Sequence, residues 1–132
     1  MGSVGHHLAF EFDGPTIGAT LGRAVEVFAE AVADIHPSLV ADAHPVELTG
    51  ATPAALLLAV LEECLRCGRE GRVAVGLDCA VLDGVLRGSM ATVPLDDPHV
   101  AAALPSVLSW HEVSLDPAPS DGGRWRGRVV AR

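Results

Sequence analysis

Asp83-Gly84 stands between two stretches, residues 73–81 and 85–93, in which apolar side chains tend to alternate with other side chains. Aspartate and glycine tolerate the positive φ angles of a type I′ turn, whose twist suits a two-residue connection between antiparallel strands. A period of two is typical of a strand that packs on one face. The sequence therefore predicts a β-hairpin over residues 73–93.

Two further regions, near the ends of the chain, show strand patterns. Residues 107–115 and 124–131 alternate, and the connection between them, residues 116–123, is rich in proline, aspartate and glycine, so they predict a closing hairpin. Residues 8–12 alternate more loosely and are followed by an Asp-Gly-Pro turn at residues 13–15. A short strand or hairpin is therefore expected to open the chain.

Two segments have the periodicity of amphipathic helices. The first begins at Thr20 and ends before Pro37. In the second, Thr52 is a suitable N-cap and Pro53 occupies the first helical position, where its missing N–H has no cost. Gly68 then predicts a left-handed C-terminal cap.

The order of these elements indicates the fold class. It reads strand or hairpin, helix, a short strand at residues 46–48, helix, hairpin and hairpin, with a helical turn at residues 100–104 between the hairpins. This order predicts an α+β fold, a mainly antiparallel sheet with two helices packed on one face. A length of 132 residues is usual for one domain, and the 49% of hydrophobic residues can form a sizeable core, so we expect one domain spanning residues 1–132.

Composition restricts the classes of partner. A formal net charge of −8 disfavours direct contact with nucleic acid, because the phosphate backbone repels it. No stretch approaches the roughly 20 apolar residues of a membrane span, and the first seven residues lack the features of a signal peptide. We therefore expect a soluble, cytoplasmic protein without membrane contact.

Three cysteines, Cys64, Cys67 and Cys79, are an odd number and are expected to be free thiols. Cys64 and Cys67 have the spacing of a zinc-ligand pair, with Cys79 and a histidine as candidate further ligands. Their position in the last turns of a helix favours simple core packing over redox chemistry, because the helix dipole there raises thiol pKa values. Five histidines lack ligand spacing and are interpreted as a surface scatter: His6, His7, His36, His44 and His99.

The predicted closing hairpin contains most of the candidate functional side chains. His111 and Glu112 are neighbours on a strand, so they should point to opposite faces, one half-buried and the other exposed. Arg124, Arg126 and Arg128 should share one face, either as a row that receives an acidic partner surface or phosphates, or as charges that protect a sheet from edge aggregation. Trp110 and Trp125 can pair across the hairpin.

Five short motifs, in this order and spacing, resemble those of the archease family. They are Phe12-Asp13 with Ile17-Gly18-Ala19 (the family's glycine-bearing strand), Val25-Glu26-Val27-Phe28 to Ala33, Ala55-Leu56-Leu57 with Leu61-Glu62-Glu63, Trp110-His111-Glu112-Val113, and Gly123-Arg124-Trp125-Arg126 to Val130. The resemblance covers almost the whole chain. It implies an archease-like fold and a protein that is not itself an enzyme.

The resemblance also implies a partner and a cofactor. Archeases promote the guanylylation and turnover of a GTP-dependent, tRNA-splicing-type RNA ligase, and they bind a divalent cation, so Ca²⁺ or Mg²⁺ is the implied ion. Asp13 matches the family's metal-binding aspartate, with Glu11 as the nearby second carboxylate. His111, Glu112 and Arg126 are the implied partner-binding residues.

At four positions the chain departs from the family pattern. Phe10 replaces the motif histidine, Glu11 its threonine, Ser106 a lysine, and Ala131 the near-terminal aspartate. These replacements leave a second hypothesis open, a degenerate archease-like interaction or scaffold domain without metal binding or ligase stimulation. A third, less favoured hypothesis is a small thiol or zinc hydrolase that uses the three cysteines and His111.

Overall fold

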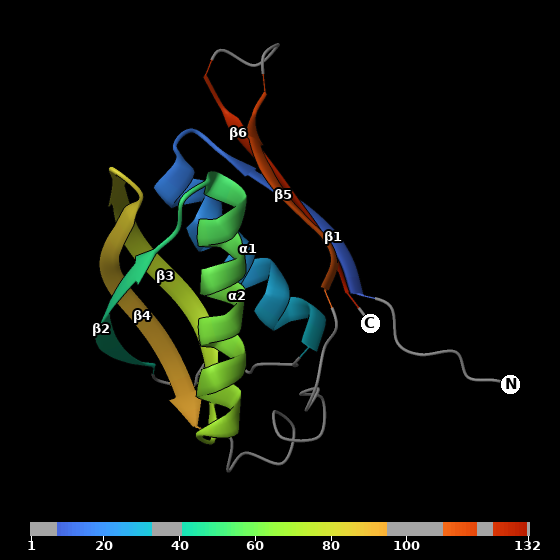
Figure 1. The fold of residues 1–132 in the computed structure, drawn as a ribbon. Coiled ribbons are helices and arrows are strands. Elements are labelled where there is room, and N and C mark those ends of the chain that lie inside the picture. The colour runs from blue at the N-terminus through green and yellow to red at the C-terminus, as the bar shows by residue number, and fades with distance from the viewer. Residues whose placement is uncertain (1–7, 33–40, 95–109, 119–122, 132) are drawn as a thin grey trace, which may run out of the picture.

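A computed structural model describes residues 8–32, 41–94, 110–118 and 123–131, which form two helices and two three-stranded sheets (Figure 1). In chain order the elements are β1 (Leu8–Gly14), α1 (Ile17–Val32), β2 (Asp42–Thr49), α2 (Pro53–Arg69), β3 (Arg72–Leu82), β4 (Val85–Pro94), β5 (Trp110–Pro117) and β6 (Trp125–Ala131). The strand orders are β1-β6-β5 and β2-β4-β3, and every neighbouring pair is antiparallel.

The two helices occupy the space between the sheets. In Figure 1 the β2-β4-β3 sheet lies on one side of the helices and the β1-β6-β5 sheet on the other. Helix α1 packs on β3 and β1, and α2 packs on β5, β3 and β2, so each helix joins both sheets. The predicted α+β class and antiparallel pairing are confirmed, although the described strands divide into two sheets where one was expected.

The core between these layers consists of aliphatic side chains, as the scarcity of aromatic residues implies. Its largest fully buried members come from both helices and from β4, β5 and β6: Leu21, Val25, Leu56, Leu57, Val60, Leu61, Leu86, Met90, Val93, Leu115 and Val129. Among the described residues, neither helix is long and apolar enough to cross a membrane.

The predicted Asp-Gly hairpin is confirmed as β3 and β4. Asp83 and Gly84 have φ angles of 52° and 74°, the positive values of a type I′ turn. The register shifts between Ala74 and Gly76, where β3 has an extra residue, so its early part departs from simple alternation. The short strand expected at residues 46–48 is longer, because all of β2 pairs with β4.

The helix boundaries test the capping predictions. Thr52 is the N-cap of α2, and its side chain accepts a hydrogen bond of 3.1 Å from the Ala55 N–H, as predicted. The cap predicted at Gly68 is wrong, because the helix continues to Arg69 and the left-handed residue is Gly71, with φ of 83°. Gly71 then stands directly before β3, which begins at Arg72.

Helix α1 begins earlier than its periodicity indicated. The Thr16 side chain accepts a hydrogen bond from the Ala19 N–H at 3.0 Å, which caps the helix ahead of Thr20. The segment matched to the family's glycine-bearing strand, residues 17–19, is consequently helical. Several predictions fall outside the described residues: the end of the first helix near Pro37, the helical turn at 100–104, Ser106, and four of the histidines.

Helix α1 also lies unusually close to β3, the edge strand of its sheet. A Cβ atom added at Gly18 would lie 2.5 Å from the Cys79 carbonyl oxygen, and one added at Gly22 would lie 2.6 Å from that of Leu77. Real Cβ atoms do not approach backbone this closely, so the two glycines allow the helix to cover this edge.

Candidate functional site

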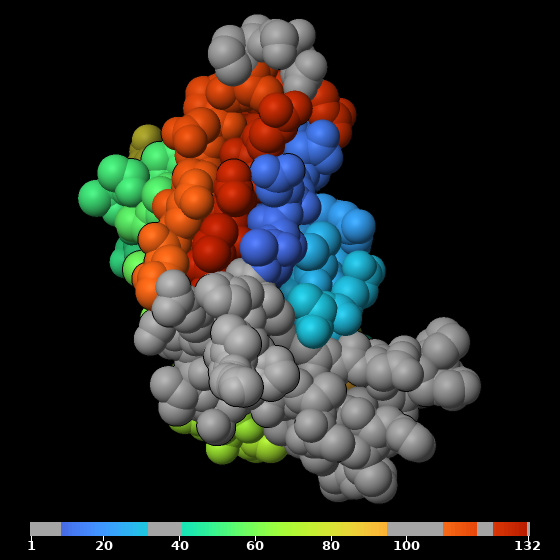
Figure 2. All heavy atoms as spheres, turned by 90° about the vertical axis from the view of Figure 1, so that its right-hand side faces the viewer, coloured from blue at the N-terminus to red at the C-terminus, as the bar shows by residue number. Residues whose placement is uncertain are grey.

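The outer surface of the β1-β6-β5 sheet collects most of the predicted site residues. Outward-pointing side chains form a central row of arginines along β6 with acidic residues of β1 and β5 on either side, and the three strands lie side by side in Figure 2. We call this surface the charged face, and it comprises Glu11, Asp13, Glu112, Ser114, Asp116, Arg124, Arg126 and Arg128. The prediction that the three arginines share one face is confirmed.

Carboxylates and guanidinium groups pair across the strands of the charged face. Arg124 Nη2 lies 3.5 Å from Asp13 Oδ2. Arg128 reaches both sides, with Nη1 4.0 Å from Glu11 Oε1 and Nε 3.7 Å from Glu112 Oε2. These side chains are 44–67% exposed, so solvent screens each pair, and each contributes at most about 1 kcal/mol to stability.

A shallow hollow of about 410 Å³ opens on the charged face between β1 and β6. Its lining is Glu11, Phe12, Asp13 and Arg126. Gly127 is directly opposite Phe12 in the strand register, and the Phe12 ring covers it so closely that a Cβ there would lie 2.2 Å from Cε2. This contact lies on the core side of the sheet, while the hollow on the outer side has charged walls of both signs.

The two carboxylates predicted to bind a divalent cation lie on this face. A hard cation such as Ca²⁺ takes six or more oxygen ligands. Asp13 and Glu11 instead face arginines, and among the described residues neither belongs to a group of three or more potential ligands within 4.8 Å of one another. Among the described residues these two carboxylates form ion pairs and gather no further oxygen ligands, and metal binding here stays an untested prediction.

Two residues that stand where the motif resemblance would place polar side chains are part of the apolar packing. The Phe10 ring centroid lies 6.0 Å from that of Phe12 and 6.2 Å from that of Phe28. Ala131 is fully buried. Both residues point away from the charged face, because they alternate with its outward-facing positions.

His111 sits at an irregularity in the β5–β6 ladder, where the register shifts between Trp110 and Glu112. His111 and Glu112 are both exposed, so the expectation that one is half-buried is wrong, because the bulge interrupts the alternation. Glu112 points to Arg128 on the charged face.

The expected tryptophan pair is also wrong. Trp110 is opposite Ala131, and Trp125 is opposite Pro117 at the other end of the hairpin. Trp110 instead donates a hydrogen bond of 3.0 Å from Nε1 to Glu62 Oε1, which connects β5 to α2.

The three cysteines are free, as predicted, but they do not converge. Cys64 is buried in the core, while the Cys79 thiol on β3 lies 3.6 Å from the Gly18 carbonyl oxygen. Burial raises the pKa of all three thiols, that of Cys79 to about 11. Protonated thiols are poor nucleophiles, so these environments favour packing over thiol catalysis.

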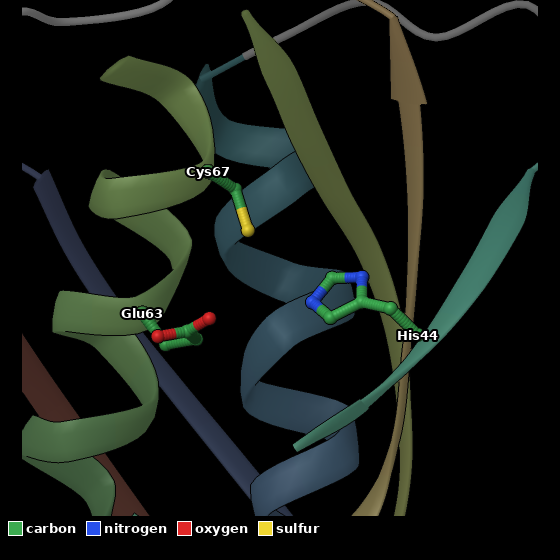
Figure 3. A group of neighbouring side chains, drawn as sticks. All are labelled: His44, Glu63 and Cys67. Carbon is green, nitrogen blue, oxygen red and sulfur yellow. The ribbon is translucent and has the colours of Figure 1, made fainter. Parts of the chain in front are cut away.

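A second group of potential metal ligands lies between α2 and β2, and it contains only one residue, Cys67, of the zinc-ligand set that the cysteine spacing suggested. His44 on β2 points toward Glu63 and Cys67 on α2 (Figure 3), and the ligand atoms of the three residues lie within 4.8 Å of one another. His44 is half-buried and its Nε2 atom has no hydrogen-bond partner. The interpretation of His44 as a surface residue is therefore wrong. The cysteine spacing signalled Cys67 and an unspecified histidine, and the i, i+4 spacing places Glu63 on the same side of the helix as Cys67.

Neighbouring side chains hold two members of the His44-Glu63-Cys67 cluster in place. Arg66 donates from Nε to Glu63 Oε1 at 2.9 Å and from Nη2 to Oε2, and its Nη1 donates to Glu70 Oε2 at 2.6 Å. These hydrogen bonds lower the pKa of Glu63 and keep it ionised. The Cys67 sulfur lies 4.0 Å from the Met90 sulfur beneath it.

The two packed antiparallel sheets with their intervening helices define an α+β fold that solved structures share. This chain superposes on a crystal structure of an archease, described as a possible chaperone, from Thermotoga maritima, with a TM-score of 0.64 and 13% sequence identity. The match covers 94% of this chain and 88% of the Thermotoga chain. A solution structure of a Methanobacterium thermoautotrophicum protein covers 98% and 94% of the two chains, with a TM-score of 0.65 and 17% identity. The fold is therefore a divergent archease-like fold. No family model and no curated protein matches the sequence.

Proposed function

We propose that this protein is an archease-like accessory protein that acts on a protein partner and catalyses no reaction itself. The observation that carries the proposal is the archease-like fold, which extends over nearly the whole of both compared chains. The description of the Thermotoga protein as a possible chaperone supports a non-enzymatic role. The protonated state of the three thiols is consistent with this role.

The proposed partner is a GTP-dependent, tRNA-splicing-type RNA ligase, whose guanylylation the protein promotes. The motif resemblance supports this partner, and the net charge of −8 favours contact with the ligase over contact with its RNA. The charged face is the proposed docking surface. Its arginine row, its hollow and the exposed His111 and Glu112 offer charges of both signs to a partner, which suits specific orientation.

No cation takes part in this proposal. Asp13 and Glu11 face arginines, and Phe10 and Ala131 pack in the interior. Titration with Ca²⁺ and Mg²⁺ while the melting temperature is followed tests this step, because an ion that binds only the folded state must raise that temperature. An increase that Asp13→Asn abolishes would restore the cation to the mechanism.

The main experiment measures guanylylation of a ligase from the same organism over a range of accessory protein to ligase ratios. Stimulation should occur, and Arg126→Ala should weaken it, because Arg126 lines the hollow. Arg87→Ala is the matched control: Arg87 is exposed and pairs with Glu47 at 2.8 Å on the other sheet. An active ligase that shows no stimulation at any ratio would reject the proposal.

A degenerate interaction or scaffold domain is the alternative function. The replacement of two polar family positions by the packed residues Phe10 and Ala131 favours it. Two results together would support this alternative. The protein would leave ligase activity unchanged, and the Asp13→Ala variant would bind the ligase as well as the wild-type protein does.

A further inference from the structure

We propose that His44, Glu63 and Cys67 bind a transition metal ion of the zinc class, which connects strand β2 to helix α2. This site shares no residue with the charged face, so the proposal is independent of the proposed ligase partner. Three observations support it: the kinds of donor, their convergence, and the arrangement of the surrounding charges.

The donor set is one imidazole nitrogen, one cysteine sulfur and one carboxylate oxygen. Zn²⁺ accepts all three of these ligands, whereas Ca²⁺ and Mg²⁺ require oxygen donors. Thiolate and imidazole together select zinc and its neighbours in the first transition series. The chemistry of this cluster therefore differs from that of the carboxylates on the charged face.

The geometry requires only a small closure around an ion. Ligand bonds to Zn²⁺ are about 2.0–2.3 Å, so tetrahedral donors lie roughly 3.3–3.8 Å apart. The three donor atoms already lie within 4.8 Å of one another, so the distances between them need to shorten by at most about 1–1.5 Å to reach that spacing. An ion would also give the buried Nε2 of His44 the partner that it lacks among the described residues.

The surrounding charges suit a dication. Arg66 holds both oxygens of Glu63, as the second shell of a metal site commonly holds a ligating carboxylate, and it also pairs with Glu70. Binding of an ion would displace the proton of the Cys67 thiol to solvent, so that this thiolate and the carboxylates of Glu63 and Glu70 would face Arg66 and a dication. The local charges then cancel, which lowers the cost of placing an ion beside a guanidinium group.

The position of the site gives the ion a structural role. β2 is an edge strand of the β2-β4-β3 sheet, and α2 contacts it. A metal bridge from His44 to two residues one turn apart on α2 joins the edge strand to the helix. Zn²⁺ should therefore raise the melting temperature of the protein, because the assembled ligands exist only in the folded state.

Cobalt substitution tests the site directly. Protein stripped of metal with a chelator and kept reduced is titrated with Co²⁺, which reports on tetrahedral coordination through visible bands and on thiolate ligation through a near-ultraviolet charge-transfer band. We expect both signals to saturate at one equivalent and to disappear when Zn²⁺ is added. The same protein should show a higher melting temperature with Zn²⁺ than without it.

Variants assign the ligands. Cys67→Ala should abolish the charge-transfer band, and His44→Gln should lower Zn²⁺ affinity at least about 100-fold. Cys64→Ala and His111→Gln are matched controls, because they remove a buried thiol and an exposed imidazole outside the cluster, and both should retain binding. If Cys67→Ala does not fold, His44→Gln decides the question, since that side chain is only half-buried.

Three outcomes would overturn the proposal. The first is an absence of Co²⁺ and Zn²⁺ binding by the folded wild-type protein. The second is binding that shows no thiolate band and is abolished when His6 and His7, which are adjacent in the sequence, are both replaced. Such binding would mark an imidazole site elsewhere in the chain. The third is binding that survives both His44→Gln and Cys67→Ala.

Discussion

The charged face and the His44-Glu63-Cys67 cluster both gather ionisable side chains, but in opposite environments. Ion-pairing residues of the charged face are 44–67% exposed, whereas the Glu63 side chain in the cluster is 13% exposed. Water screens the former, so no single pair there matters greatly to folding. In the cluster, Arg66 holds the poorly solvated carboxylate of Glu63, whereas the buried Nε2 of His44 has no hydrogen-bond partner among the described residues.

The same kind of ion pair therefore has a different role in each region. On the charged face, Arg124 and Asp13 make a single contact of 3.5 Å. In the cluster, Arg66 engages both oxygens of Glu63. A bidentate and partly buried pair fixes the position of a carboxylate, while a single exposed contact leaves it free to exchange partners. The first arrangement suits ligand positioning, and the second suits a docking surface.

The largest effect is expected directly beneath the cluster. Met90 is fully buried and contacts Cys67, so Met90→Ala should lower the free energy of unfolding by about 2–5 kcal/mol through lost burial and a cavity. Urea unfolding followed by circular dichroism measures it. Arg87→Ala on the solvent side of the same strand is the control and should cost under about 1 kcal/mol. If the two variants lowered the free energy of unfolding by the same amount, the buried and exposed sides of this strand would not differ in their contribution to stability.

The thiols provide a test of burial that does not depend on metal. Burial raises the pKa of Cys79 from 9.0 to about 11, so its thiolate fraction at pH 8 should be about 100-fold lower than that of an ordinary cysteine. Alkylation of Cys79, read by peptide mass spectrometry, should be slow in the native protein and fast in urea.

The same pKa shift has a defined sign for stability. The folded state favours the protonated thiol, so the contribution of Cys79 is complete below pH 9 and is lost as the pH rises through about 11. Cys79→Ala should flatten this part of the stability profile. Rapid native alkylation at pH 8 would show that the thiol is more accessible than the structure indicates.

A somewhat smaller effect is expected where α1 covers β3. A methyl group at Gly22 would meet the Leu77 carbonyl oxygen, which belongs to backbone and moves little, so Gly22→Ala should cost about 1–3 kcal/mol despite the better helix propensity of alanine. Thermal unfolding measures it. Ala19→Ser, on the exposed side of the same helix, should change stability by less than about 0.5 kcal/mol. A stabilised Gly22→Ala would contradict this packing.

The smallest effect is expected on the charged face. Asp13→Asn removes one exposed ion pair with Arg124 and should change the free energy of unfolding by less than about 1 kcal/mol, with the difference vanishing at high salt. Unfolding curves at low and high ionic strength measure both features. A loss above about 2 kcal/mol would mean that Asp13 has a stronger partner than an arginine, such as a bound cation.

Local signals predicted much of the fold. Thr52 caps α2 and Asp83-Gly84 turns the hairpin because capping and turn geometry depend on only a few neighbouring residues. The predictions that failed required information from elsewhere in the chain. Gly68 did not end α2, and the β5–β6 bulge exposed His111 beside Glu112, because strand pairing and packing decide such details.

The two functional regions divide in the same way. Alternation along one strand places Arg124, Arg126 and Arg128 on one face, so sequence alone identified the core of the charged face. It could not identify the cluster, because His44 is separated from Glu63 and Cys67 by a turn and half a helix, and nothing local indicates that its imidazole points inward. Only the packing of α2 on the β2-β4-β3 sheet brings the three donors together.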